Sequence, residues 1–458
     1  MPDNNELTRK EMLMRSAFGL GAIPTLSLSS VQNTLGGMEQ VAHPLAPKAP
    51  HFAPRAQRVI FLYQSGGVSH IDTFDPKPEL QKNHGKKVAS RRGNLALKKS
   101  DWEARPFGEN GTMVSSLFPE MGSMIDDICL IRSMHGNHNG HNPAILHMHT
   151  GSNGSAMPGI GAWLSYALGT QNTELPSHVV FCKDAPYAGT QSWDSYFLPS
   201  YHQGVRITPS DDPIPNLKAF RKAELQDKEL KMLKQVNEQH LLSRRGTSDL
   251  MARMVAFKSA YSMQNIVPEL FDVSDESDST LDMYGVERGD NSSYAWQCLM
   301  ARRMAEKGVR FIELVDSGAY HNWDNHVDMN EHEGMASMVD KPVAALLKDL
   351  KQRGMYDDTL VVWCTEFGRT PTGTGGREHH ASVFSSWLAG GAVKGGLVHG
   401  ASDELGMKVA ENQVHVHDFH ATILHIMGLD HEKLTYRHGG RDFSLTDVHG
   451  NVVHDLLT

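Results

Sequence analysis

Short, continuous apolar segments recur along the chain, and two of them directly follow a segment with helical periodicity. Residues 338–353 are amphipathic and lead into the apolar residues 359–364, as residues 293–307 lead into 309–315. A strand without polar alternation must be buried on both faces, which is typical of parallel sheets built from alternating strands and helices. We therefore predict an α/β fold with a central, mostly parallel sheet. The predicted strands cover residues 58–64, 127–132, 177–182, 309–315 and 359–364.

The composition supports one large globular unit. The 458 residues are 40% hydrophobic and 21% charged, which excludes a wholly disordered, collagen-like or coiled-coil chain. We predict that residues 55–458 form the α/β domain. Within it, residues 216–264 carry apolar residues at helical spacing among many Lys, Glu and Gln, so a two-helix insertion is expected there.

The first 32 residues have the composition of an export signal. The basic stretch TRKEMLMR precedes an uncharged segment rich in Gly, Ala and Ser, and resembles a twin-arginine signal in which Lys10 replaces the second arginine. The alternative is an ordinary amphipathic helix. The segment is too weakly apolar for a membrane span, and no other segment reaches that length. Residues 33–54, rich in Pro, Ala and Gly, predict a linker. We expect a protein of the periplasm or cell envelope.

Charge and cysteine content exclude some functions. The formal net charge is −9, which argues against sequence-independent nucleic-acid binding. Four cysteines without C-x-x-C spacing predict neither a disulfide scaffold nor a cysteine zinc site. The 26 histidines are the unusual feature, because clustered histidines suggest metal or phosphate chemistry.

Histidines and carboxylates follow four of the predicted strands. The carboxyl ends of parallel strands meet at one edge of a sheet, so we expect these side chains to gather there. A mixture of carboxylate and imidazole suits a divalent transition metal such as zinc. The candidate residues after the four strands are His70 and Asp72; His138 and His141; Asp324 and His326; and Glu366, His379 and His380.

Other polar residues near these positions have simpler interpretations. Asp75, followed by a proline, suits turn chemistry. His147 and His149 are expected to be helix-packing residues.

Several strings resemble one exported bacterial family. TLVVWCTEFGRTPTG, GREHH, VHVHDFHATILHIMGLDH and GRDFSLTDVHG are similar to the domain of unknown function 1501, which is sulfatase-like and belongs with the alkaline-phosphatase-like superfamily. The resemblance covers roughly residue 54 to the C-terminus. It implies a three-layer sandwich around a central mostly parallel sheet, with metals at the carboxyl ends of the strands.

The resemblance also implies roles for individual residues. Glu366 takes the position of a metal-binding Asp, whereas Phe367 stands where the superfamily has a ligand histidine. Asp324 and His326 correspond to an Asp and His of the metal site, and His379 or His380 to a distal histidine. Ser65 occupies the position of the metal-binding Asp after the first strand, so His70 and Asp72 are expected to substitute for it.

The segment HNPAILHMHTG resembles the sulfatase segment that carries the formylglycine nucleophile two residues before a proline. Here that position holds His141 instead of Ser or Cys, so a formylglycine mechanism is not expected. Three roles stay open for His141: a phosphohistidine-type nucleophile, a metal ligand or a general acid. The same alignment implies that Asp418 is a helix N-cap and that His415 and His417 are structural.

Two functions compete. The first is an exported metal-dependent hydrolase of phosphate or sulfate esters, with His141 and Arg369 as catalytic residues and one or two divalent ions. Zinc is the favoured ion, with calcium or manganese as alternatives, and the substrate is a small-molecule or polysaccharide ester. The second is a non-catalytic binding or structural protein of the envelope that keeps the fold. No feature of the sequence specifies an oligomeric state.

Overall fold

The computed structural model describes residues 44–90, 93–172, 174–214, 217, 222–243 and 248–458. The predicted export signal, residues 1–32, lies outside the described residues, as does the first half of the predicted linker. Residues 44–54 of that linker run along the domain. Backbone hydrogen bonds attach them, among them those from Lys48 to Leu168 and from His51 to Gly428.

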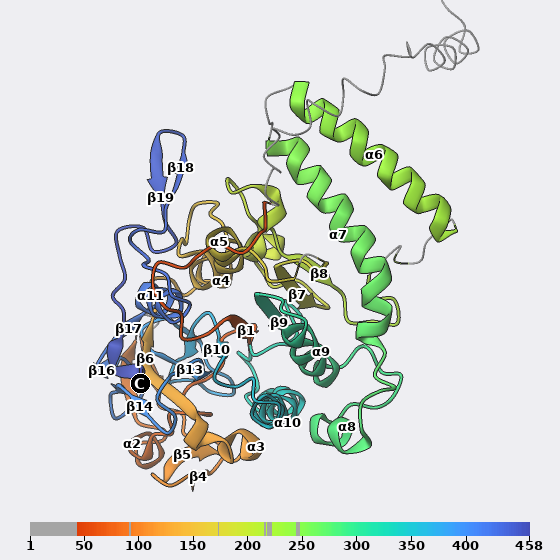
Figure 1. The fold of residues 1–458 in the computed structure, drawn as a ribbon. Helices are drawn as coiled ribbons and strands as arrows, with labels where there is room; N and C mark the ends of the chain where they lie inside the picture. The colour runs from red at the N-terminus through yellow and green to blue at the C-terminus, as the bar shows by residue number, and fades with distance from the viewer. Residues whose placement is uncertain (1–43, 91–92, 173, 215–216, 218–221, 244–247) are drawn as a thin grey trace, which may run out of the picture. The chain divides into compact units, whose positions relative to one another are not determined.

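A single nine-stranded sheet forms the centre of the domain (Figure 1), and all five predicted strands belong to it. Along the sheet the order is β14-β6-β13-β10-β1-β9-β7-β8, and β17 pairs with β6. Only β13 runs antiparallel to its neighbours within this sheet, which confirms the mostly parallel arrangement. The strands are β1 Arg58–Tyr63, β6 Ile128–His135, β7 His178–Cys182, β8 Val205–Ile207, β9 Phe311–Val315, β10 Thr359–Cys364, β13 Phe384–Gly390, β14 Val398–His399 and β17 Val414–His415.

Helices cover both faces of the sheet, which explains why its strands lack polar alternation. Ile60 and Leu62 of β1 face one apolar cluster, which also contains residues of α9 and α10. Val59 and Phe61 face the other, which contains residues of α4, α5 and α11. The three-layer sandwich is therefore confirmed. These helices are α4 His141–Thr150, α5 Ile160–Leu168, α9 Tyr294–Glu306, α10 Glu331–Gln352 and α11 Val416–Ile426.

Two long helices, α6 (Ala223–Ser243) and α7 (Ser248–Phe271), occupy the range predicted as a helical insertion and extend past its expected end (Figure 1). They lie side by side, and α7 also contacts α9. Tyr261 and Asp227 are hydrogen-bonded across the pair.

Short helices and five two-stranded hairpins complete the domain. No helix in the described part of the chain combines the length and apolar character needed to cross a membrane. The remaining elements are α2 Pro78–Lys82, α3 Pro119–Gly122, α8 Asp278–Tyr284, β2 Lys87–Ser90, β3 Gly93–Ala96, β4 Ala104–Phe107, β5 Thr112–Ser115, β11 Gly368–Arg369, β12 His379–His380, β15 Ala401–Ser402, β16 Val409–Glu411, β18 Tyr436–His438 and β19 Arg441–Phe443.

Candidate metal centre

The carboxyl edge of the sheet gathers side chains from two loops, one short strand and one helix. β1, β9, β10 and β6 run in the same direction, so the segments that follow them start at the same edge. Asp324 follows β9, Glu366 follows β10, and His141 begins α4 after β6. His379 belongs to the short strand β12, which pairs with β11.

His141 lies between two carboxylates. Its Nδ1 donates a hydrogen bond of 2.8 Å to Oε1 of Glu366, and its Nε2 lies 3.0 Å from Oδ2 of Asp324. Burial opposes the charged ring, but the hydrogen bonds to Asp324 and Glu366 outweigh burial and raise the pKa of His141 to about 9. The imidazole also stacks on Tyr187, with ring centroids 4.3 Å apart.

Two further histidines surround the same carboxylate. Oδ1 of Asp324 lies 3.0 Å from Nε2 of His379 and 2.9 Å from Nε2 of His326. The two Nε2 atoms are themselves 2.9 Å apart. One ligand atom from each of His141, Asp324 and His379 can be chosen so that all lie within 4.8 Å of one another, a spacing that suits one shared ion.

Hydrogen bonds orient two of these rings for metal binding. The Nδ1 of His379 donates to the carbonyl oxygen of Asn139 at 2.7 Å, as the Nδ1 of His141 donates to Glu366. In the metal-free protein Nε2 of each ring donates a hydrogen bond to Asp324; a ring that keeps its proton on Nδ1 can release the Nε2 proton and bind a metal ion there. Metal-bound histidines generally donate their other N–H to a carboxylate or carbonyl in this way. The donor set, one carboxylate and two imidazoles, therefore fits a divalent transition metal.

Neighbouring residues stabilise the ionised form of Asp324. Burial opposes ionisation, but hydrogen bonds from His141 and His379 and the charge of Arg369 lower the pKa of this carboxyl well below its usual range. Asp324 is therefore an ionised, acceptor-only group, as a metal ligand must be.

Both carboxylate oxygens of Glu366 accept hydrogen bonds from other residues of the protein. Oε1 accepts from the backbone N–H of Gly66 at 2.9 Å as well as from His141. Oε2 accepts from the hydroxyls of Tyr63 at 2.8 Å and Thr365 at 3.1 Å. The structure thus places Glu366 behind His141, where it orients the ring.

Arg369, predicted as a catalytic residue, is fully buried beneath the centre. It donates to the carbonyl oxygens of Gly66, Gly67 and Arg377 and, at 2.6 Å, to Oδ1 of Asp324. These contacts hold the paired-glycine turn after β1 against Asp324. Both glycines have positive φ, and a Cβ at Gly67 would lie 2.5 Å from the Phe367 ring. Arg369 is positioned as a structural support of the carboxylate.

Three predicted ligands are not brought to this group. Asp72 forms a buried ion pair with Arg377, 2.7 Å from Oδ2 to Nε. The Nε2 atoms of His70 and His380 donate to the carbonyl oxygens of Gly406 and Met407, at 3.1 and 2.7 Å. The rings of His70 and His380 instead stack on each other, with their centroids 6.3 Å apart, beside the loop that contains Gly406 and Met407.

Three further expectations concern His138, Asp75 and Asp418. His138 is exposed, and its Nδ1 accepts a hydrogen bond from the Gly140 backbone. Asp75 pairs with Lys77 at 2.8 Å, in keeping with a structural role. At α11 the N-cap is His415 rather than Asp418, whose carboxylate accepts from the His415 backbone at 2.9 Å.

Sequence reasoning missed three residues of this region. Tyr63 ends β1 and was counted as an apolar strand residue. Asp316 directly follows β9, so the rule used for Glu366 could have found it; its buried carboxyl, with a pKa raised by burial to about 7, accepts from Trp323 and the Ser65 backbone. Tyr187 follows β7 in a long loop and carried no recognisable signal.

Fold and site together define a three-layer α/β protein with a candidate His/Asp metal centre at the carboxyl edge of its sheet. The chain belongs to the family described as "Protein of unknown function (DUF1501)", whose family model matches residues 56–457. The resemblance predicted from the sequence is thereby confirmed. No curated protein matches the chain.

Several solved structures are similar to this chain at low identity. The lipoteichoic acid synthase LtaP from Listeria monocytogenes is 10% identical, with 91% of this chain and 80% of that chain covered and a TM-score of 0.38. The sulfatase PsFucS1 from Pseudoalteromonas sp. is 10% identical (82% and 69% covered, TM-score 0.34). A protein in the alkaline phosphatase superfamily from Vibrio parahaemolyticus is 11% identical (86% and 72% covered, TM-score 0.34). Similarity at this level does not establish a shared activity.

Proposed function

We propose that this protein is an exported, metal-dependent hydrolase of phosphate or sulfate esters that works without a formylglycine nucleophile. The observation that carries the proposal is the convergence of His141, Asp324 and His379, whose ligand atoms lie within 4.8 Å of one another. Partly buried imidazoles around an ionised carboxylate, with outer hydrogen-bond acceptors that orient the rings, are typical of a metal site.

Asp324, His141 and His379 would hold the ion, with His326 as a fourth donor on the more exposed side. Zinc suits this nitrogen-rich set better than calcium, which prefers oxygen ligands; manganese is intermediate. When bound, such an ion polarises an ester oxygen and lowers the pKa of a coordinated water.

The residues around the centre would keep the ligands in the protonation state and orientation that bind a metal ion. Glu366 and Asn139 hold a proton on Nδ1 of His141 and His379 and so direct each Nε2 inward. Arg369 fixes the carboxylate of Asp324. Tyr187, whose hydroxyl lies 3.5 Å from Oδ2 of Asp324, is partly exposed and can donate a hydrogen bond to a bound ester oxygen.

Among the three roles left open for His141, the contacts favour the metal ligand. A nucleophilic imidazole needs one nitrogen that faces the substrate, whereas both nitrogens of His141 face carboxylates. The nucleophile would therefore be water. The substrate class stays a small-molecule or polysaccharide ester.

The alternative is a non-catalytic envelope protein that keeps the fold and the metal. The observation in its favour is that Arg369 is committed to Asp324 and backbone carbonyls. The predicted stabiliser of a developing oxyanion therefore has its donors directed elsewhere.

One experiment distinguishes the hydrolase from the non-catalytic protein. Full-length protein is freed of metal, reloaded with Zn²⁺, Mn²⁺ or Ca²⁺, and assayed against chromogenic phosphate monoesters, phosphate diesters and sulfate esters. We expect metal-dependent turnover that Asp324→Asn abolishes and that Asp328→Asn, an exposed carboxylate four residues away, leaves unchanged. Metal binding at the centre without turnover of any ester would support the non-catalytic protein.

A further inference from the structure

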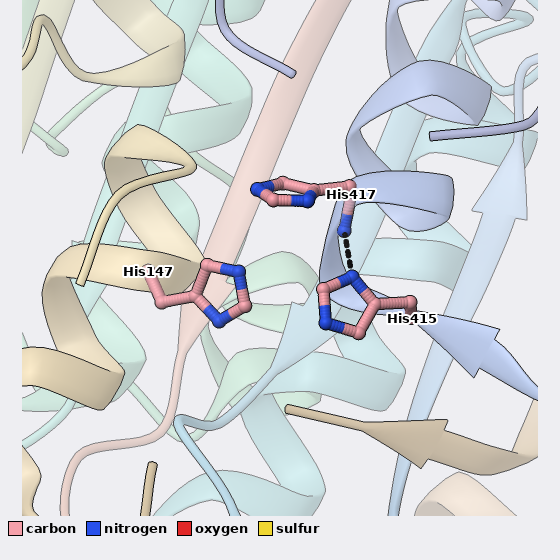
Figure 2. Close-up of side chains that lie close together, drawn as sticks. All are labelled: His147, His415 and His417. Carbon is pink, nitrogen blue, oxygen red and sulfur yellow. Dashed lines mark hydrogen bonds between the residues drawn. The ribbon is translucent and has the colours of Figure 1, made fainter. Parts of the chain in front are cut away.

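Three histidines outside the centre described above face one another (Figure 2). His147 lies on α4, whereas His415 and His417 lie at the start of α11. One nitrogen from each ring can be chosen so that all three lie within 4.8 Å of one another. Helix α4 and the junction between β17 and α11 therefore bring three imidazoles together.

Hydrogen bonds on the outer sides of two rings determine which nitrogen carries the lone pair. The Nε2 of His417 donates to the carbonyl oxygen of Gly151 at 2.7 Å, so in the neutral ring Nδ1 is the free base. The Nε2 of His415 lies 3.0 Å from Oδ1 of Asn137, and its Nδ1 accepts from the backbone N–H of His417. In both His415 and His417, therefore, a hydrogen-bond acceptor faces Nε2, on the far side of the ring from the lone pair on Nδ1. Metal-bound histidines are oriented in the same way.

Two ring nitrogens of this group are buried and unsatisfied. Within the part of the chain that the structure describes, neither Nε2 of His147 nor Nδ1 of His417 has a hydrogen-bond partner. Their residues are only 3% and 6% exposed. A buried polar nitrogen without a partner is unfavourable, because it has lost its hydrogen bond to water and gained none in return. A group that binds both nitrogens would restore the lost interactions.

We propose that His147, His415 and His417 form a second metal site, which binds one divalent transition ion, Zn²⁺ first, through Nε2 of His147 and Nδ1 of the other two. Binding would replace the 3.2 Å hydrogen bond that Nδ1 of His415 accepts, which is at the long end of the normal range. Three imidazoles without thiolate or carboxylate suit zinc, copper or nickel, not calcium or magnesium.

The site is accessible to ligands. His147 and His417 line a cavity of about 280 Å³, together with the exposed residues Arg441 and His449. A site with three protein ligands, two of them in the wall of a cavity, has a coordination position left for water or another small ligand, as in catalytic rather than structural zinc sites.

This site is distinct from the centre at Asp324. The two share no ligand, although both use α4: His141 is its first residue and His147 is six residues further along. Six residues correspond to about 9 Å of helix rise, too far for one mononuclear coordination sphere.

The test uses full-length, tag-free protein that carries Asp324→Asn, which disables the first centre without touching the second. After chelation and removal of the chelator, Zn²⁺ is titrated by calorimetry, bound metal is counted by mass spectrometry, and Co²⁺ is added as a visible-absorption probe. We expect one equivalent of Zn²⁺ per chain and a Co²⁺ spectrum of low coordination number. No bound Zn²⁺ and no Co²⁺ absorption in this folded protein would overturn the proposal.

Ligand variants in the same Asp324→Asn background identify the site. His417→Gln and His147→Gln should each weaken Zn²⁺ binding at least ~100-fold, because loss of a ligand should cost no less than loss of an outer-shell partner. Asn137→Ala should weaken it about 10- to 100-fold. His438→Gln, at an exposed histidine outside the lining of this cavity, is the control and should bind normally. Equal loss in this control, or full binding in the ligand variants, would contradict the assignment. Circular dichroism establishes that each variant is folded.

Discussion

His141 and Glu366 are 225 positions apart, yet Nδ1 of the histidine donates a 2.8 Å hydrogen bond to Oε1 of the carboxylate. The contact joins the start of α4 to the end of β10 and directs Nε2 of His141 toward Asp324. Glu366 is itself held by Tyr63 and the Gly66 backbone, so it is a fixed acceptor. Such a carboxylate behind a ligand histidine fixes the tautomer and raises the basicity of the ring.

Glu366→Gln should therefore weaken metal binding without removing a ligand. The neutral amide is a weaker acceptor for the His141 N–H, and we expect a loss in Zn²⁺ affinity of about 10- to 100-fold with the fold retained. Calorimetric titration of metal-free protein measures the change. Glu109→Gln, an exposed substitution of the same kind, is the control. Unchanged affinity in Glu366→Gln would show that the hydrogen bond does not support a ligand.

His141→Ala distinguishes the metal ligand from the nucleophile. As a ligand variant, it should lose metal at the first centre together with ester turnover, with an affinity loss of at least ~100-fold, because loss of a ligand should cost no less than loss of an outer-shell partner. The controls are His138→Ala, a nearby exposed histidine, and metal counting in each sample. A variant that keeps its metal but loses turnover, with a trappable covalent adduct on the wild-type imidazole, would make His141 the nucleophile instead.

Much of the fold could be predicted because the apolar strand segments carry a local signal. All five predicted strands occur, whereas β13, whose seven residues are all buried, was not predicted. The sequence FSSWLAG has two serines near its start and a glycine at its end, and no helix directly precedes it as one precedes β9 and β10.

The sequence could predict only those residues of the candidate site that follow a strand of the sheet. Asp324, His141 and His379 follow strands that share an edge, and the structure brings them together. His70 and Asp72 also follow a strand, but the partner of Asp72 is Arg377, and the 305 positions between them leave no local signal. A motif can locate a residue near a sheet edge. It cannot show which buried arginine neutralises a carboxylate there.

Export is tested on native protein. Residues 1–32 have signal composition, so N-terminal sequencing of the protein from the cell envelope should begin beyond residue 32. Replacement of Arg9 and Lys10 by Gln should hold the protein in the cytoplasm, because the basic region directs translocation. Mature protein that still starts at Met1 in the envelope fraction would contradict a cleaved signal.

A buried pair beneath α4 should contribute a pH-dependent part of stability. Nε2 of His149 lies 3.0 Å from Oε1 of Glu313 on β9, and its Nδ1 donates to the carbonyl oxygen of Ile145 at 2.8 Å. Burial opposes the charged ring, but Glu313 and these hydrogen bonds raise the pKa of His149 above its usual value. His149 was expected to be a helix-packing residue, and it does pack there, as one partner of an ion pair.

Because the folded pKa is raised, the stabilisation from this pair is fully present below the unfolded pKa near 6.5 and is lost as pH rises through the folded value. The free energy of unfolding, measured with urea in the presence of chelator, should therefore fall in that window for the wild type. His149→Ala should cost about 3–5 kcal/mol near pH 6, because Glu313 is left buried without a partner. The double variant His149→Leu with Glu313→Leu replaces both charges by apolar groups, so it should lose much less and lack this pH dependence. A double variant as unstable as His149→Ala would show that the loss comes from packing and not from the unpaired carboxylate.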